Sequence, residues 1–111
     1  MEYVLTSSGI GRVAITADAV AQIVGLTVAE CYGVVGMSSS RLRRLLRRSS
    51  IELAGTDGSV SIAVHVVVEH GLNLAEVAST VRNRVSYEVE RMTGLTVAAV
   101  EVHIEAVKVS A

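Results

Sequence analysis

The chain has 111 residues, of which 50% are hydrophobic and 19% charged, and ten basic against eleven acidic residues leave a formal net charge of -1. It contains 21 valines and one cysteine, but no phenylalanine, tryptophan or proline. This composition excludes a disordered chain and an intrachain disulfide framework and argues against a general polyanion binder. No apolar run approaches the roughly 18 residues of a membrane span.

The first clear pattern is a short strand that leads into an amphipathic helix. Val13 and Ile15 share one face of an extended segment, and Thr16 is placed to cap the helix that follows. Apolar and small side chains then recur at intervals of three and four residues: Val20, Ile23, Val24, Thr27, Val28 and Cys31. Gly33 stands where a helix end favours glycine, and residues 33–40 are expected to form a loop.

A block of positive charge follows this loop. Residues 41–48 hold five of the nine arginines, and three leucines share the opposite helical face. The pattern predicts a short basic amphipathic helix. The arginines are Arg41, Arg43, Arg44, Arg47 and Arg48.

The second half of the chain predicts strand, strand, helix, strand. Residues 51–53 alternate, residues 55–59 form a turn around Asp57 and Gly58, and residues 61–69 form the clearest strand. A helix begins at Asn73, with Glu76 completing a capping-box-like start, and runs to Thr93. The last strand extends from residue 95 to about 109, and its apolar phase switches near residue 106, which predicts a bulge.

These elements predict an α+β fold, as one domain over residues 1–111. The order is strand, helix, short helix, strand, strand, helix, strand. A small, mainly antiparallel sheet with helices packed on one face would bury every apolar stripe. The N-terminus has no basic segment followed by an apolar one, so we expect no secretory signal and an intracellular protein.

Three stretches together resemble a known family. They are residues 11–37, the valine strand that ends at His70 and Gly71, and the segment from Glu88 to Leu95 with the strand that follows. In order and spacing they are similar to the alkaline shock proteins, or Gls-type general stress family, the envelope stress response proteins of Gram-positive bacteria. The resemblance runs from about residue 9 to about residue 109.

The resemblance implies a non-enzymatic cytoplasmic protein that gathers at the inner face of the cell membrane. Members of the family self-associate, and some are held by a membrane-anchored partner from the same family. The family has no established catalytic residues, so none is expected here, and no cofactor is implied. This chain departs from the family in its dense arginine block and in lacking long polar tails.

The arginine block has several interpretations. It fits a solvated helix or a charged loop, a contact with an anionic membrane surface, or a contact with an acidic partner. A further alternative is a KH-like nucleic-acid-binding module, in which the loop from Gly33 to Gly36 and the basic helix would clamp a nucleic-acid backbone. Against this, both residues between the glycines are valine, and the rest of the chain offers no broad basic surface, so nucleic acid is the weaker prediction.

The remaining chemistry-bearing residues predict no catalytic or metal site. His65 and His103 fall on outward positions of two strands, with glutamates at 69, 101 and 105, and would suit zinc only if the strands were neighbours. We expect a wetted strand face instead, and no bound metal. Cys31 lies on an apolar helix face, where a buried and inert thiol is expected.

One feature favours assembly of several copies. Aliphatic residues occupy positions of the sheet that should face water: Ala63, Val67, Val107 and Val109. An open sheet face or edge of this kind invites self-association, unless a helix or the N-terminal segment covers it. The sequence therefore predicts a homo-oligomer that docks at the membrane through its arginine block.

Overall fold

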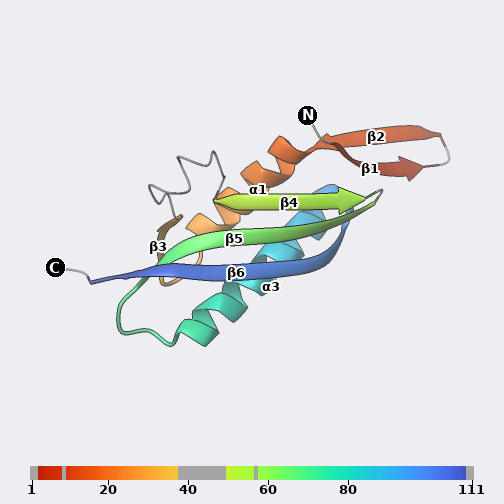
Figure 1. Ribbon diagram of the computed structural model, residues 1–111. Coiled ribbons are helices and arrows are strands. Elements are labelled where there is room, and N and C mark those ends of the chain that lie inside the picture. The colour runs from red at the N-terminus through yellow and green to blue at the C-terminus, as the bar shows by residue number, and fades with distance from the viewer. Residues whose placement is uncertain (1–2, 9, 38–49, 57, 110–111) are drawn as a thin grey trace.

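The computed structural model describes residues 3–8, 10–37, 50–56 and 58–109, and Figure 1 labels its elements. They are β1 (Tyr3–Ser8), β2 (Gly11–Thr16), α1 (Ala17–Ala29), β3 (Val34–Met37), β4 (Ile51–Thr56), β5 (Ser59–Glu69), α3 (Leu74–Thr93) and β6 (Thr96–Lys108).

The main sheet is built around β5. On one side β5 pairs with β6 in parallel, and on the other it pairs antiparallel with both β4 and β3. The first half of β5 faces β4 and its second half faces β3, so these two short strands follow one another along the same edge. Helix α3 connects β5 to β6 and lets the chain return to the same end of the sheet, as a parallel pair requires.

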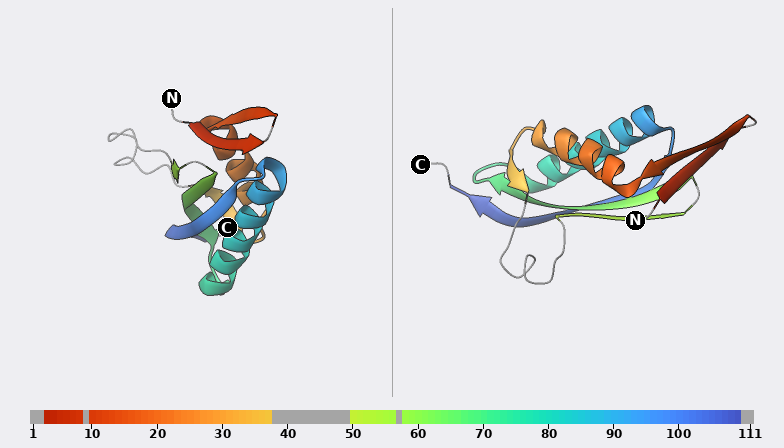
Figure 2. Two further views of the ribbon diagram at one scale, coloured as in Figure 1. Left: turned by 90° about the vertical axis from the view of Figure 1, so that its right-hand side faces the viewer. Right: turned by 90° about the horizontal axis from the view of Figure 1, so that it is seen from above.

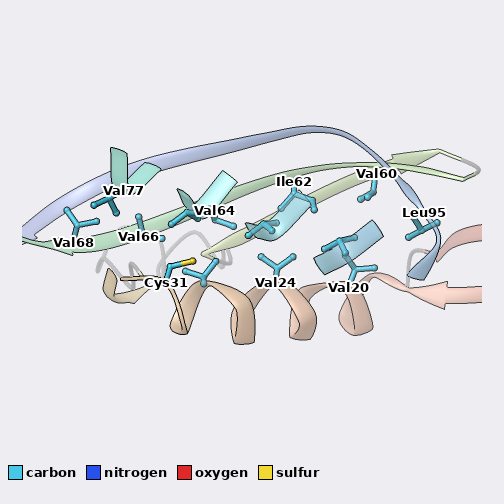
Figure 3. Close-up of a cluster of buried hydrophobic side chains, with 14 residues drawn as sticks. Val20, Val24, Cys31, Val60, Ile62, Val64, Val66, Val68, Val77 and Leu95 are labelled. Carbon is cyan, nitrogen blue, oxygen red and sulfur yellow. The ribbon is translucent and has the colours of Figure 1, made fainter. Parts of the chain in front are cut away.

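Both helices cover the same face of this sheet, as the view from above in Figure 2 shows. The core between the helices and the sheet is almost entirely valine, because each of these elements presents one apolar stripe to the layer between them (Figure 3). Its members are Val20, Val24, Val28, Cys31, Val60, Ile62, Val64, Val66, Val68, Val77, Val81, Val85, Val89 and Leu95. Most of these residues are no more than 2% exposed, so small β-branched side chains fill the layer without any aromatic ring.

The helices begin and end where local chemistry predicts. The Thr16 hydroxyl accepts a hydrogen bond from the Ala19 amide, and the Asn73 side chain accepts one from the Glu76 amide. Gly94 ends α3 with a φ of 75°, a left-handed conformation that glycine adopts without steric cost.

A separate hairpin of β1 and β2 precedes α1. Its six register pairs run from Tyr3 and Thr16 to Ser8 and Gly11, and Figures 1 and 2 show it projecting from the end of the main sheet. The sequence predicts β2 but assigns no element to the first residues.

The α+β fold with helices on one face is confirmed, and three of its four strand pairings are antiparallel. Two expectations were wrong: residues 34–37 form strand β3 rather than part of a loop, and β1 was not expected. The bulge near Ala106 is confirmed by a register shift where Val66 and Val67 face Ile104 and Ala106. The predicted basic helix over 41–48 lies outside the described residues.

Candidate functional site

The face of the sheet opposite the helices carries a cluster of five polar side chains from three strands. We call it the histidine–carboxylate cluster: Glu52, His65, Glu101, His103 and Glu105. Strand β4 supplies the first, β5 the second and β6 the other three.

Strand register brings these residues together. The hairpin between β4 and β5 pairs Glu52 with Ala63, and the amide of His65 donates to the carbonyl of Ser50. The parallel pairing of β5 and β6 places His65 directly beside His103. Side chains on this face alternate with the buried valines of β5, as the two-residue period of a strand requires.

His65 is the centre of the cluster. Its Nδ1 atom lies 2.5 Å from a carboxylate oxygen of Glu105, and its Nε2 atom lies 2.7 Å from a carboxylate oxygen of Glu52. Only 7% of His65 is exposed, although the residue occupies the polar face of its strand. A single imidazole therefore bridges the two strands that flank β5.

The second imidazole stacks on the first. The rings of His65 and His103 are nearly parallel, with 4.6 Å between their centroids and 15° between their planes. His103 also lies 3.6 Å from Glu101, and both of these side chains are well exposed, at 48% and 72%. This outer pair is thus far weaker than the contacts of His65.

The chemistry of the inner contacts is hydrogen bonding. An ionised carboxylate only accepts, so His65 donates to both glutamates when each of its ring nitrogens carries a proton. Bonds between an imidazolium and carboxylates are charge-assisted and about twice as strong as neutral ones. The arrangement ties β4, β5 and β6 together on the side of the sheet that has no helix.

The same geometry bears on metal binding. The two nitrogens of His65 already face carboxylate oxygens at hydrogen-bonding distance, with no room for an ion between them. In the described part of the chain, no group of three or more His, Cys, Asp or Glu side chains is arranged to hold a metal.

Sequence reasoning placed both histidines on the outer face but expected a wetted surface, and it missed Glu52. The near burial of His65 shows that this expectation was wrong for one of the two histidines. A signal for Glu52 was present. A tight turn at Gly58 makes Thr56 and Ser59 register partners, and counting back along both strands brings Glu52 diagonally opposite His65.

The four residues predicted for self-association do not form one patch. Ala63 and Val67 lie on the open face, where both are partly buried. Val107 is the register partner of the core residue Val68, so it points toward the helix side, where it is 43% exposed. Val109 follows the end of β6 and is 69% exposed.

The five arginines of the arginine block lie in residues 38–49, outside the described part of the chain. Gly33 and Gly36 do not flank an exposed loop: Gly36 is paired with Val67 inside the sheet. Gly33 has a φ of 90°, and a Cβ atom on it would come within 2.7 Å of Leu72 Cδ1. Its role is close packing, which removes the loop on which the KH-like alternative depended.

Cys31 is buried and unpaired with another cysteine. Burial raises the pKa of its thiol and outweighs the opposing effect of the Arg84 charge. The thiol donates to the carbonyl of Thr27 at 3.4 Å. Because a protonated thiol is a poor nucleophile, this geometry supports the structural role expected from the sequence.

None of the helices in the described ranges is both long and apolar enough to cross a bilayer.

Besides the cluster, the open face has a shallow hollow of about 390 Å³ beside Glu52 and Glu101. It is floored by small side chains, among them Ala54, Ser61 and Ala99.

Comparison with known families and proteins identifies relatives of this chain. The model of the alkaline shock protein family, described as having a cell envelope-related function, matches residues 6–109. A protein from Streptococcus pyogenes, named Uncharacterized protein Spy1614, is 31% identical over an alignment of 108 positions, and the match covers 89% of each chain. Uncharacterized protein YloU of Bacillus subtilis is 28% identical over 109 residues, covering 90% of this chain and 91% of its own. These matches confirm the resemblance seen in the sequence.

Solved structures share the fold at much lower identity. The one titled MamM CTD H264E has a TM-score of 0.54 and 13% identity, and the match covers 80% of this chain and 93% of that one. The one titled MamM CTD E289H - Nickel form has the same TM-score with 12% identity, covering 80% and 96%. At this identity the likeness extends to the fold alone.

Proposed function

We propose, because this chain belongs to the alkaline shock protein family with its cell envelope-related function, that it is a non-enzymatic envelope stress response protein. It self-associates and docks at the cytoplasmic face of the membrane, through a membrane-anchored partner or through the anionic lipid surface. Family membership over residues 6–109 is the observation that carries the proposal.

A binding role suits the surfaces better than catalysis does. The thiol of Cys31 is buried with a raised pKa, and the two ring nitrogens of His65 are both engaged by carboxylates. A catalytic base must lie within hydrogen-bonding reach of its substrate, whereas both nitrogens of His65 face carboxylates of the same chain. The hollow on the open face is lined by small side chains such as Ala54 and Ser61 together with the carboxylates of Glu52 and Glu101.

Self-association is supported by the one-sided packing of the sheet. Both helices lie on a single face, so Ala63 and Val67 stand on a face that no described helix covers. Among the described strands, β6 also forms an edge of the sheet. Open faces and edges with aliphatic residues are the surfaces through which β-proteins associate.

Membrane docking is assigned to the arginine block because of its charge density. Near an anionic leaflet each basic residue contributes about 1 kcal/mol, so five arginines are enough to hold a peripheral protein in a salt-dependent way. The rest of the chain carries four arginines and one lysine against eleven acidic residues and would be repelled.

The test compares charge reversals in two places. Replacing Arg43, Arg44 and Arg47 by glutamate is expected to abolish co-sedimentation with vesicles containing phosphatidylglycerol. The matched control reverses three arginines of α3 instead (Arg82→Glu, Arg84→Glu and Arg91→Glu), which changes the net charge equally and is expected to leave most of the binding.

Membranes from the source organism separate the two modes of docking. If a membrane-anchored protein holds the chain, protease treatment of the membranes removes binding, whereas a lipid contact survives it. Unchanged sedimentation of the Arg43, Arg44 and Arg47 variant in both assays would refute the role of the arginine block. Salt-sensitive binding of single-stranded RNA without membrane binding would refute membrane docking and assign the arginine block to a nucleic-acid contact instead.

A further inference from the structure

Strand β6 has one edge without a partner among the described residues. Along its inner side it pairs with β5 from Ser59 to Glu69, while no other described strand pairs with it. A strand edge presents alternating amide and carbonyl groups that a second strand can pair with. At 13 residues β6 is the longest strand of the sheet, so this edge is extensive.

The apolar residues of β6 remain partly exposed at this edge. Val100, Val102 and Ile104 pack against the core but are each only half-buried. Their register partners on β5 are Ile62, Val64 and Val66, none more than 2% exposed. The difference arises because β5 has neighbours on both sides and β6 has one. An additional strand would bury the remaining apolar surface.

Two bulges limit where such a strand can pair regularly. The register of β6 against β5 shifts between Val97 and Ala99, and again between Ile104 and Ala106. Between these shifts, residues 99–104 form one regular stretch. Bulges twist a strand away from its neighbour, so a partner strand is confined to this stretch.

A second copy of the same stretch is the partner that its side chains fit. Two identical strands related by a two-fold axis pair antiparallel, and residues opposite each other must point to the same face. Four residues near the middle of the stretch can lie on the two-fold axis. Val100 fits poorly, because a centre there leaves Val102 and Ile104 without regular partners, so three centres remain. A centre at Glu101 places that glutamate opposite itself, and a centre at His103 places that histidine opposite itself.

The third centre, Val102, avoids both like pairs. It places Glu101 of each copy opposite His103 of the other, so two complementary pairs form on the open face. On the helix face it sets Val100 against Ile104 and Val102 against itself, which joins the half-buried aliphatic residues of both copies. Cross-strand pairs of both kinds stabilise antiparallel sheets.

We infer that two copies of this chain join through the outer edges of their β6 strands, antiparallel and centred on Val102, to form one continuous sheet. The inference rests on the proposed self-association and specifies its interface. It moves the contact from the four residues that the sequence suggested to the edge between the two bulges.

Cysteine pairs test the register directly. One chain carries Glu101→Cys and a second, larger tagged chain carries His103→Cys, and the two are mixed and mildly oxidised. Opposite residues in antiparallel strands have Cβ atoms about 4.5–5.5 Å apart, close enough for a disulfide after small adjustments. Two cysteines at the same position of two identical variants would instead be offset by two residues along the strands. The mixed disulfide should therefore exceed either homodimer by about five-fold or more. The native chain and a Tyr87→Cys chain, with its cysteine on the exposed side of α3, control for random collision and for Cys31.

Each outcome decides between registers or removes the interface. A dominant Glu101→Cys homodimer would place the centre at Glu101, a dominant His103→Cys homodimer would place it at His103, and either overturns the inference. Oligomers in sedimentation experiments without any of these disulfides would refute the β6 edge and leave the proposed self-association standing. A monomer from micromolar to near-millimolar concentration would refute both. Circular dichroism of each variant, before mixing, separates misfolding from loss of pairing.

Discussion

Replacing His65 by leucine tests whether the histidine–carboxylate cluster stabilises the fold. The substitution keeps a side chain of similar size at a position that is only 7% exposed, but it removes both hydrogen bonds to carboxylates. The side chain of Glu105 is 29% exposed, and its bond is worth about 1.5 kcal/mol, the lower end for a charged partner. Glu52 is 51% exposed, so solvent screening reduces its bond to about 0.5 kcal/mol.

We therefore expect His65→Leu to lower the free energy of unfolding by about 2 kcal/mol, which corresponds to a fall in Tm of roughly 10 °C for a domain of this size. Urea denaturation at one low protein concentration measures the change without a contribution from association. His103→Leu is the matched control, because it alters the same residue type on the same face, where the side chain is 48% exposed and has one carboxylate contact at 3.6 Å. Its cost should stay below about 1 kcal/mol.

Two results would refute this reasoning. One is a loss of stability below about 0.5 kcal/mol in His65→Leu, since the two bonds would then be no better than contacts with water. The other is an equal loss in both variants, which would assign the effect to the stacked rings. A double-mutant cycle with Glu105→Gln measures the coupling between the two side chains.

Three further substitutions or treatments test the local structure. Gly33→Ala should destabilise the fold by about 1–3 kcal/mol in urea denaturation, because its Cβ atom would meet Leu72 at 2.7 Å in a left-handed conformation; no loss would show that this turn relaxes freely. Asn73→Ala removes the cap that accepts from the Glu76 amide and should cost about 1 kcal/mol in the same assay. Cys31 should react with a maleimide far more slowly in the folded chain than in urea, because it is buried and its pKa is raised; equal rates measured by mass spectrometry would contradict the buried position.

The parts of the fold that the sequence predicted well depend on neighbours along the chain. Thr16 and Asn73 cap their helices through residues three positions away, and Gly94 ends α3 through its own backbone conformation. The valine stripes of α1 and α3 have the helical period and are buried as expected. Such signals need no knowledge of where the rest of the chain lies.

The parts that were missed depend on partners far away in sequence. Strand β3 has only four residues, one of them a glycine, and it becomes a strand through pairing with Val66–Val68 about thirty residues later. Strand β1 is likewise defined by its partner β2. Short segments with weak alternation are assigned by tertiary pairing, which overrides local propensity.

The candidate site was predictable only in part, for the same reason. The period of β5 placed His65 on the open face, and the tight turn at Gly58 fixed the register that brings Glu52 near it. Predicting that His103 lies beside His65 required knowing that β6 pairs with β5 and runs parallel to it. A strand that follows a long helix can take either edge of the sheet, so the sequence alone left this neighbour undetermined.

The bulge near Ala106 affects both the histidine–carboxylate cluster and the open edge of β6. The change of apolar phase predicted its position, but its consequence follows only from the structure: Ile104 and Ala106 are partners of consecutive residues on β5, which leaves Glu105 as the extra residue. That extra residue is the one whose carboxylate reaches His65. The same irregularity ends the regular stretch of residues 99–104 through which we propose that two copies pair. A single backbone feature therefore places the carboxylate that holds His65 and limits the regular part of the open edge of β6.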